Sequence, residues 1–406
     1  MRIALFFLLM MVHCCALGQN MAELNRDLTT LTSAKFAGRG YVQGGLAKAS
    51  NYIQSRLGKM GVESQTQSYS FQVNTFPKKS KLAFGDVKLL EGEDYIIDPR
   101  SGRFQGDAEL AYIDSASLMS GTYTAHQKGE VTVINTKGID TPDEVDVQYD
   151  FVKKAIEISP VILLKEKLTW SVGQQTHEYP IIEILESSYP ADSHSISIKV
   201  SPEMINFEAE NVIAKIDGHR SDSLVVFSAH FDHLGKMGKA YFPGASDNAS
   251  GTSMVIDLAR YYVQNKPEFD TYFIFFSGEE AGLRGSYHFV NHPTFDLARV
   301  KFLLNLDLMG SAEKGITVVN GRLYEDKMKD LAAINTEKQF VPKIKLRGKA
   351  ANSDHYWFSE VGVPAVFIYT EGNIAAYHDI YDTAEVVDWA NYDGVFTLLV
   401  EFVKTL

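Results

Sequence analysis

The chain has 406 residues, of which 45% are hydrophobic and 22% are charged, and its formal net charge is -12 at pH 7. A chain of this length can hold two domains and bury a full core, and its composition is typical of a soluble globular protein. The net negative charge argues against nucleic-acid binding, which requires a basic surface.

Residues 1–18 have the pattern of a signal peptide. Arg2 is the only charged residue of this segment, residues 3–12 are apolar, and small residues lead up to Gly18, near which we expect cleavage. The apolar run is too short to span a membrane. We therefore predict a secreted or periplasmic protein with no membrane span. Both cysteines of the chain lie in this segment, and lipid attachment at one of them is a less favoured alternative.

The rest of the chain is predicted to form one domain that is interrupted by another. Residues 19–78 contain a helical pattern that ends near Gly61, and we expect them to join residues 206–406 in the first domain. Residues 79–205 change to short β-rich runs separated by Gly, Pro and Asp turns, as at residues 130–134, 161–164 and 181–185. We therefore expect a small β-rich insert that supplies none of the candidate ligands.

Three apolar runs in the C-terminal half each lead into a polar residue suited to metal binding. Leu224–Ala229 precedes His230, Thr271–Phe276 precedes Glu279 and Glu280, and Lys301–Leu306 ends at Asp307. Short, nearly continuous apolar runs of this kind predict strands buried on both faces, as in a parallel sheet under helices. Because ligands collect at the carboxyl ends of such strands, we expect these polar side chains to converge at one edge of the sheet.

One helix is predicted before the last of these strands in the sequence, and another is predicted after it. Residues 250–264 place Met254, Leu258 and Tyr262 on one face of a helix that directly follows Asp247. Residues 386–403 form a plausible closing helix. Together with the buried strands, these helices predict an α/β fold with a mixed central sheet flanked by helices.

Two imidazoles and three carboxylates recur in short polar segments of this half. They belong to His230, Asp247, Glu280, Asp307 and His378. This set of ligands suits Zn²⁺ and similar divalent metals. A further carboxylate, that of Glu279, stands beside a candidate ligand, where a general base would be needed. The pattern therefore predicts a two-metal hydrolase site.

The order and spacing of these segments resemble peptidase family M28, in its branch of secreted zinc aminopeptidases of the leucyl-aminopeptidase type. The motifs that carry the resemblance are Phe36-Ala37-Gly38-Arg39-Gly40, residues 228–235, 244–248, 277–282 and 305–310, Ser353-Asp354-His355, and Tyr377-His378-Asp379. The resemblance implies a zinc-exopeptidase fold of the phosphorylase/hydrolase-like type. It also implies that residues 79–205 are a protease-associated insert.

The resemblance further implies which residues hold two Zn²⁺ ions per chain. Asp247 would bridge both metals, because each oxygen of one carboxylate can face one cation. His230 and Asp307 would complete one metal site, and Glu280 and His378 would complete the other. A cis peptide bond between Asp247 and Asn248 is also implied.

Glu279 and Asp232 have implied roles in catalysis rather than in metal binding. Glu279 would be the general base that takes a proton from a metal-bridging water. Asp232, two residues after His230, would fix the tautomer of that imidazole. Tyr377 is a candidate for the wall of the substrate pocket.

Each candidate also has an ordinary structural explanation. Asp247 could belong to a turn, and the Glu279–Glu280 pair could be the first-turn acids of a helix. Five such coincidences in the order of one family are improbable, so the metal-binding interpretation is favoured. For His233 and His355, by contrast, a purely structural role is favoured.

The predicted function is that of a two-zinc exopeptidase that hydrolyses N-terminal residues from peptide substrates. One alternative is an enzyme similar to glutaminyl cyclases, with a single zinc, and metal content would separate the two. A less favoured alternative is a non-catalytic binding protein on the same scaffold. The sequence leaves open the preferred residue at the cleaved position, the native metal, the role of the insert and the oligomeric state.

Overall fold

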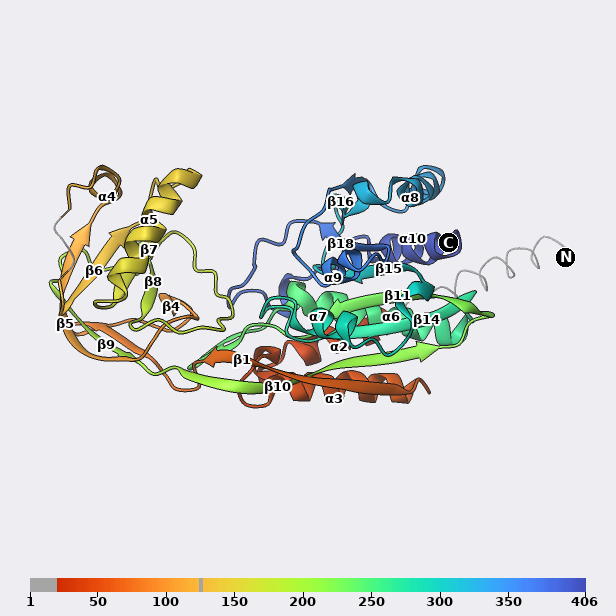
Figure 1. The fold of residues 1–406 in the computed structure, drawn as a ribbon, viewed down its shortest axis with the longest axis horizontal. Coiled ribbons are helices and arrows are strands. Elements are labelled where there is room, and N and C mark those ends of the chain that lie inside the picture. The colour runs from red at the N-terminus through yellow and green to blue at the C-terminus, as the bar shows by residue number, and fades with distance from the viewer. Residues whose placement is uncertain (1–19, 124–126) are drawn as a thin grey trace, which may run out of the picture.

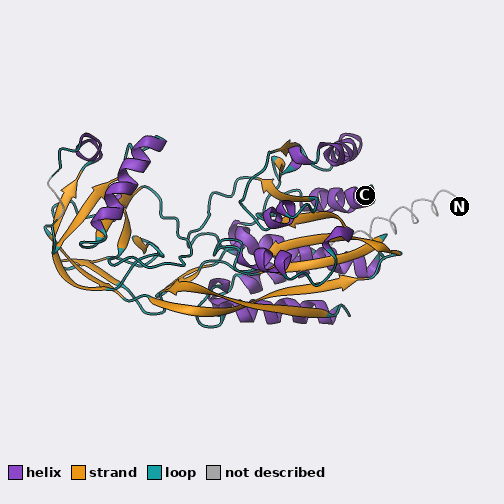
Figure 2. Ribbon diagram, viewed as in Figure 1, coloured by secondary structure: helices purple, strands orange, loops and turns teal. Residues whose placement is uncertain are grey.

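The fold, seen in a computed structural model that describes residues 20–123 and 127–406, combines two large β-sheets (Figure 1). The signal-peptide prediction for residues 1–18 lies outside the described residues. Figure 2 shows the strands of both sheets in orange and the helices in purple. Across residues 20–123 and 127–406, no helix combines the length and the apolar character that a membrane span requires.

The first sheet has eight strands in the order β1-β10-β14-β11-β15-β18-β16-β17. Its strands are β1 (Ser64–Thr75), β10 (Glu203–Ile216), β11 (Arg220–His230), β14 (Phe269–Phe276), β15 (Val300–Leu306), β16 (Gly315–Val319), β17 (Ile344–Leu346) and β18 (Ala365–Glu371). The four central strands β14, β11, β15 and β18 are parallel to one another, and β16 is parallel to β17. The pairs β1–β10, β10–β14 and β16–β18 are antiparallel. The predicted mixed sheet is therefore confirmed.

Helices cover both faces of this sheet because its central strands are apolar on both sides. In β11, Val225 and Phe227 belong to a core shared with α2, α3, α6 and α10, while Leu224 and Val226 belong to a core shared with α7 and α9. The helices are α2 (Met21–Leu31), α3 (Gly45–Lys59), α6 (Gly251–Gln264), α7 (Arg284–Asn291), α8 (Glu325–Lys338), α9 (His355–Glu360) and α10 (Tyr392–Val403). The near-continuous apolar runs thus have the burial expected of a parallel sheet under helices.

The second sheet also has eight strands and is built from residues 81–200, in the order β3-β2-β9-β5-β6-β7-β8-β4. Its strands are β2 (Lys81–Phe84), β3 (Val87–Lys88), β4 (Tyr95–Ile97), β5 (Phe104–Ile113), β6 (Glu130–Asn135), β7 (Val161–Lys165), β8 (Ile181–Leu185) and β9 (Ser195–Val200). Two helices accompany it, α4 (Ser115–Ser120) and α5 (Pro142–Ala155). The three runs expected to be strands in this segment correspond to β6, β7 and β8.

The two sheets are joined by the long antiparallel pair of β1 and β10, which extends from the first sheet toward the second (Figure 1). An apolar cluster also links them, because Trp170 stacks on Phe242 with ring centroids 4.6 Å apart. Phe242 belongs to a small hairpin of β12 (Gly235–Met237) and β13 (Ala240–Phe242) that follows β11. The second sheet is therefore anchored close to the loop that carries His233.

The closing helix begins later than the sequence pattern predicts. The segment from Val386 was expected to be helical, but α10 starts at Tyr392. A short 3-10 helix, Ala384–Val386, comes first, and Asn391 then adopts a left-handed conformation with φ of 56° directly before α10. Apolar spacing alone does not reveal such a break, because the buried residues Val387 and Trp389 continue the apolar pattern through it.

Candidate metal centre

Most of the predicted ligands lie at the carboxyl ends of the parallel strands. His230 is the last residue of β11, and Asp307 directly follows β15. Glu279 and Glu280 come three and four residues after the end of β14. Because these three strands are adjacent and parallel, their ends bring the side chains to one edge of the sheet.

Asp247 reaches the same edge from the single helical turn Ala245–Ser250, which precedes α6. The peptide bond between Asp247 and Asn248 is cis, as the family resemblance implied. The buried carboxylate of Asp382 accepts hydrogen bonds from the backbone N–H groups of Ser246 (2.8 Å) and Asp247 (3.0 Å). These hydrogen bonds fix the turn to an acidic side chain that was not predicted to belong to the site.

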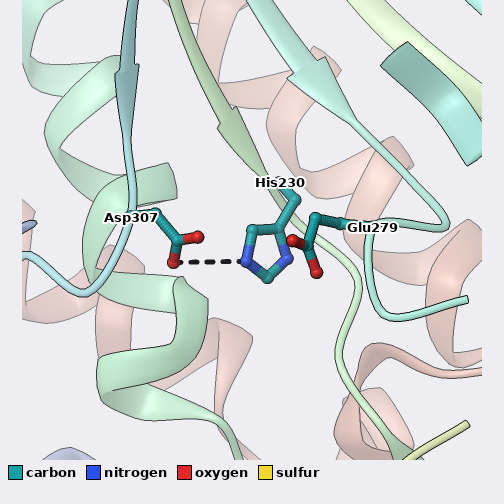
Figure 3. Close-up of side chains that lie close together, drawn as sticks. All are labelled: His230, Glu279 and Asp307. Atoms are coloured by element: carbon teal, nitrogen blue, oxygen red, sulfur yellow. Dashed lines mark hydrogen bonds and ion pairs between the residues drawn. The ribbon is translucent and has the colours of Figure 1, made fainter. Parts of the chain in front are cut away.

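The two imidazoles lie on opposite oxygens of Asp247. His230 Nε2 is 3.2 Å from Asp247 Oδ1, and His378 Nε2 is 3.0 Å from Asp247 Oδ2. A second carboxylate stands beside each ring, with Asp307 Oδ1 3.3 Å from His230 Nε2 and Glu280 Oε2 3.3 Å from His378 Nε2. Figure 3 shows Asp307 and Glu279 on either side of the His230 ring. The structure therefore brings all five predicted ligands together, with Asp247 in the middle.

The donor atoms of this cluster fit a divalent metal. Two sets of three residues each offer ligand atoms that all lie within 4.8 Å of one another, namely His230, Glu279 and Asp307, and His230, Asp247 and Glu280. Their nitrogen and carboxylate-oxygen donors are the ligand types that Zn²⁺ accepts. The geometry places Glu279 within range of the first set, so its position alone does not separate a ligand from a general base.

The ionisation of the cluster reflects an excess of buried negative charge. Burial by itself would lower the pKa of His230, but the carboxylates of Asp307 and Glu279 raise it well above its ordinary value. Burial likewise opposes the proton on His378, yet Glu280 and Asp247 raise its pKa to about 9. Protons on the imidazoles supply the positive charge that a divalent cation would supply instead, which is a second reason why a metal fits here.

The two carboxylates with the most different ionisation are Glu279 and Asp247. Burial raises the pKa of Glu279 well above its usual range, and the nearby Glu280 and Asp307 add to this effect. Burial would also raise the pKa of Asp247, but the hydrogen bonds from His230 and His378 hold it well below its ordinary value. Asp247 therefore stays charged between the imidazoles, whereas Glu279 retains a proton more readily.

Asp232 lies next to His230, but its carboxylate has other partners. His230 Nδ1 is 3.2 Å from the backbone oxygen of Asp232 and 3.7 Å from its Oδ1. The carboxylate accepts hydrogen bonds from the Tyr41 hydroxyl at 2.9 Å and from the backbone N–H of Glu279 at 3.2 Å. An Nδ1–H that donates to the backbone oxygen would leave Nε2 free for a metal. That the Asp232 carboxylate sets this tautomer stays a prediction.

Besides Asp382, sequence reasoning missed two residues that contact the cluster. His233, which was expected to be structural, is buried with its Nδ1 2.7 Å from Glu280 Oε1. The backbone oxygen of Trp170, in the segment of the second sheet, lies 3.0 Å from His378 Nδ1. The sequence offered one signal for His233, its position one residue after the His-x-Asp pair, but none for a backbone carbonyl. His355 instead packs against Phe367, with ring centroids 5.7 Å apart.

The cluster opens onto a cavity of about 430 Å³. Its walls include the apolar side chains of Leu283, Leu308 and Phe367. Tyr377 lines it as expected and stacks on His378, with ring centroids 4.0 Å apart. A cavity of this size lies within the range of small-molecule and peptide sites, roughly 300–1,000 Å³.

The fold and the cluster define an α/β protein with a candidate metal centre at the carboxyl edge of a mixed sheet. Residues 211–403 match the family model described as Peptidase family M28. This part of the chain therefore belongs to peptidase family M28, and the predicted family resemblance is confirmed.

Curated relatives include proteins named as aminopeptidases. The chain is 28% identical to Aminopeptidase YwaD of Bacillus subtilis over 189 residues, which cover 44% of this chain and 40% of YwaD. It is 26% identical to the Probable lipoprotein aminopeptidase LpqL of Mycobacterium tuberculosis over 371 residues, covering 85% of this chain and 72% of LpqL. A Vacuolar membrane protease of Schizophyllum commune is 36% identical over 104 residues, which cover 25% of this chain and only 11% of that protease.

Solved structures show the same fold. A zinc aminopeptidase from Bacillus subtilis, BSAP, aligns with a TM-score of 0.74 over 96% of this chain and 95% of its own, at 21% identity. An aminopeptidase from Aneurinibacillus sp. strain AM-1 aligns with a TM-score of 0.66 over 95% of this chain and 94% of its own, at 20% identity. These likenesses confirm the predicted fold class.

Proposed function

We propose that this M28 peptidase is a metal-dependent aminopeptidase that removes N-terminal residues from peptides. The observation that carries the proposal is the position of Asp247, with one oxygen facing His230 and the other facing His378. A carboxylate placed in this way can serve two cations at once. The family match and the aminopeptidase names of YwaD and LpqL support the same activity.

The arrangement of the five clustered side chains supports a site for two zinc ions. Asp247 would bridge them, His230 and Asp307 would hold one, and Glu280 and His378 would hold the other. When bound, zinc would polarise the peptide carbonyl and activate a water for attack. His233 and the backbone oxygen of Trp170 would orient Glu280 and His378 through their hydrogen bonds.

Glu279 would move the protons of the reaction. Its carboxylate would accept a proton from the attacking water and deliver it to the leaving amine. The raised pKa of Glu279, caused first by burial, suits a group that must hold this proton between the two steps. Asp232 would help to position Glu279, because it accepts the hydrogen bond of the Glu279 backbone N–H.

The same proposal assigns roles to the parts of the chain. Residues 19–78 and 206–406 would form the metallopeptidase domain, which the shared first sheet supports. Residues 79–205 would form a β-rich insert, which the second sheet supports. The signal-peptide pattern of residues 1–18 supports export to a periplasm or the exterior.

The test of this proposal is a panel of aminoacyl-anilides and free peptides with their N-acetylated counterparts, assayed with and without a chelator. We expect release of the N-terminal residue from the free forms only, with loss of activity on chelation and recovery on addition of Zn²⁺. Cleavage of the acetylated forms at equal rates would contradict the aminopeptidase assignment. Bound metal measured in the same preparation should approach two ions per chain, and one ion would contradict the two-zinc site.

A further inference from the structure

The substrate cavity is lined by one strongly basic side chain in addition to its acidic cluster. Of the described residues that line the cavity, Arg347 is the only arginine or lysine. We propose that Arg347 binds a carboxylate of the substrate, so that the protein prefers peptides with a negative charge close to the scissile bond. This inference rests on the proposed aminopeptidase function and adds a substrate class to it.

The backbone of Arg347 is fixed at the wall of the cavity. Arg347 directly follows β17, its N–H donates to the backbone oxygen of Val318 at 2.8 Å, and its own oxygen accepts from Arg322 N–H at 3.1 Å. The Arg347 guanidinium donates to the hydroxyl of Tyr369 at 3.3 Å, and Tyr369 lines the same cavity. The side chain is therefore aimed along the wall by a neighbour that is also part of the site.

The guanidinium of Arg347 keeps most of its donors available. Within the described part of the chain, no carboxylate forms an ion pair with it, and its side-chain hydrogen bond is the one to Tyr369. Arginine carries five N–H donors in a planar fork that matches the two oxygens of a carboxylate. An exposed arginine with a single neutral partner at the rim of a substrate cavity thus has the free donors that a carboxylate ligand needs.

The charges of the cavity are arranged to suit a dipolar ligand. The acids that line it, Asp247, Glu279, Glu280 and Asp307, all belong to the metal cluster, and Leu308 and Phe367 add apolar wall. A neutral apolar residue would gain only from that apolar wall. A carboxylate would additionally form charge-assisted hydrogen bonds with Arg347, which are about twice as strong as neutral ones.

Two parts of a peptide could supply this carboxylate. One is the acidic side chain of an N-terminal Glu or Asp, and the other is the free C-terminus of a dipeptide. Isosteric pairs separate these sources, because each pair differs in charge but hardly in shape. Glu-anilide against Gln-anilide tests the side chain, and Leu-Leu against Leu-Leu-amide tests the C-terminus.

The experiment compares kcat/KM within each pair for the wild type, Arg347→Gln, Arg347→Lys and Arg322→Gln, with bound metal measured for each. In at least one pair we expect the wild type to prefer the charged member by roughly two- to fivefold, since the arginine is exposed and partly screened. Arg347→Gln should reduce that ratio to about one, and Arg347→Lys should retain part of it. Arg322→Gln, which removes a nearby exposed charge outside the cavity, should leave the ratio unchanged.

Two results would overturn the proposal. One is a wild type that discriminates in neither pair, and the other is a preference that survives Arg347→Gln with unchanged metal content. If no substrate is cleaved at all, the aminopeptidase assignment fails separately. In that case, calorimetry with the same four compounds and the same variants still decides whether Arg347 binds a carboxylate, and equal affinities within each pair would refute it.

Discussion

The buried arginine beneath the metal centre is the residue whose loss should most clearly weaken the fold around the site. Arg39 is fully buried in the N-terminal segment, far in sequence from the metal cluster. Its guanidinium donates hydrogen bonds to the backbone oxygens of Leu31 (3.2 Å), Phe231 (2.9 Å), Pro243 (2.6 Å), Gly244 (2.7 Å) and Asp247 (3.4 Å). It therefore ties α2 to the residue that follows His230 and to the turn that carries Asp247.

The expected cost of Arg39→Met follows from these contacts. Hydrogen bonds from a charged donor contribute roughly 1.5–3 kcal/mol each, but summing five of them would overstate the loss, since the carbonyls can relax. Burial also works against the charge, because it lowers the pKa of Arg39 to about 10 in spite of the nearby Asp382 and Asp247. Removal of the charge recovers the free energy that its burial costs. We therefore expect a net loss of about 3 kcal/mol, within the ~3–5 kcal/mol typical of breaking a buried ionic network.

The assay is thermal and denaturant unfolding of the wild type, Arg39→Met and Arg39→Lys in the presence of a chelator. A loss of about 3 kcal/mol corresponds to roughly 4 °C in melting temperature for a chain of this length. Arg39→Lys should fall in between, because lysine keeps the charge but has three donors. The matched control is Arg26→Met, whose exposed side chain pairs with Glu23 on the surface of α2 and should change stability by less than ~0.5 kcal/mol.

The reasoning would be refuted if Arg39→Met melted within about 1 °C of the wild type, since ~0.5 kcal/mol is the scale of an ordinary surface substitution. Equal losses for Arg39→Met and Arg26→Met would also contradict it. Either result would mean that the five backbone oxygens find other partners and that the turn at Asp247 does not depend on this side chain.

Two further predictions concern the metal ligands. His233→Phe should weaken metal binding by roughly 10–100-fold, because Glu280 loses its N–H donor. Competition with a calibrated chelator measures this affinity. An unchanged affinity would show that the contact between His233 and Glu280 does not support metal binding. Metal binding should also release protons and weaken as the pH falls, because the raised pKa of His230 and the pKa of His378 near 9 keep both imidazoles protonated in the metal-free protein. Calorimetry in buffers of different ionisation enthalpy counts these protons, and affinity that is constant from pH 6 to about pH 9 would contradict the assignment.

The central strands and the ligands at their ends could be predicted because both depend on short-range patterns, whereas Asp247 and His378 were predicted as ligands from the family resemblance. Uninterrupted apolar runs predicted β11, β14 and β15, and these strands are buried as expected. Each run leads into a polar residue, and parallel strand ends meet at one edge, so convergence followed from topology alone. The prediction of the parallel strands therefore also predicted that the polar residues at their ends lie close together.

Other features were missed because a local pattern was blurred or because their causes lie far apart in the sequence or in the backbone. The helix α5 was missed, since Val145, Val147 and Tyr149 are exposed and blur the apolar stripe on which a helix prediction depends. The contact of Trp170 with His378 uses a backbone oxygen 208 residues away, which no side-chain pattern reveals. Asp382 likewise supports the turn at Asp247 through backbone N–H groups.

The most direct test of the proposed site measures bound metal and kcat together for Glu279→Gln and Glu280→Gln. As a general base, Glu279 contacts the attacking water rather than the metals, so Glu279→Gln should keep both ions while kcat falls by roughly 10²–10⁴. Glu280→Gln should instead lose metal, and added Zn²⁺ should restore part of its activity. Wild-type turnover in Glu279→Gln, or metal loss equal to that of Glu280→Gln, would contradict the division of roles between these adjacent carboxylates.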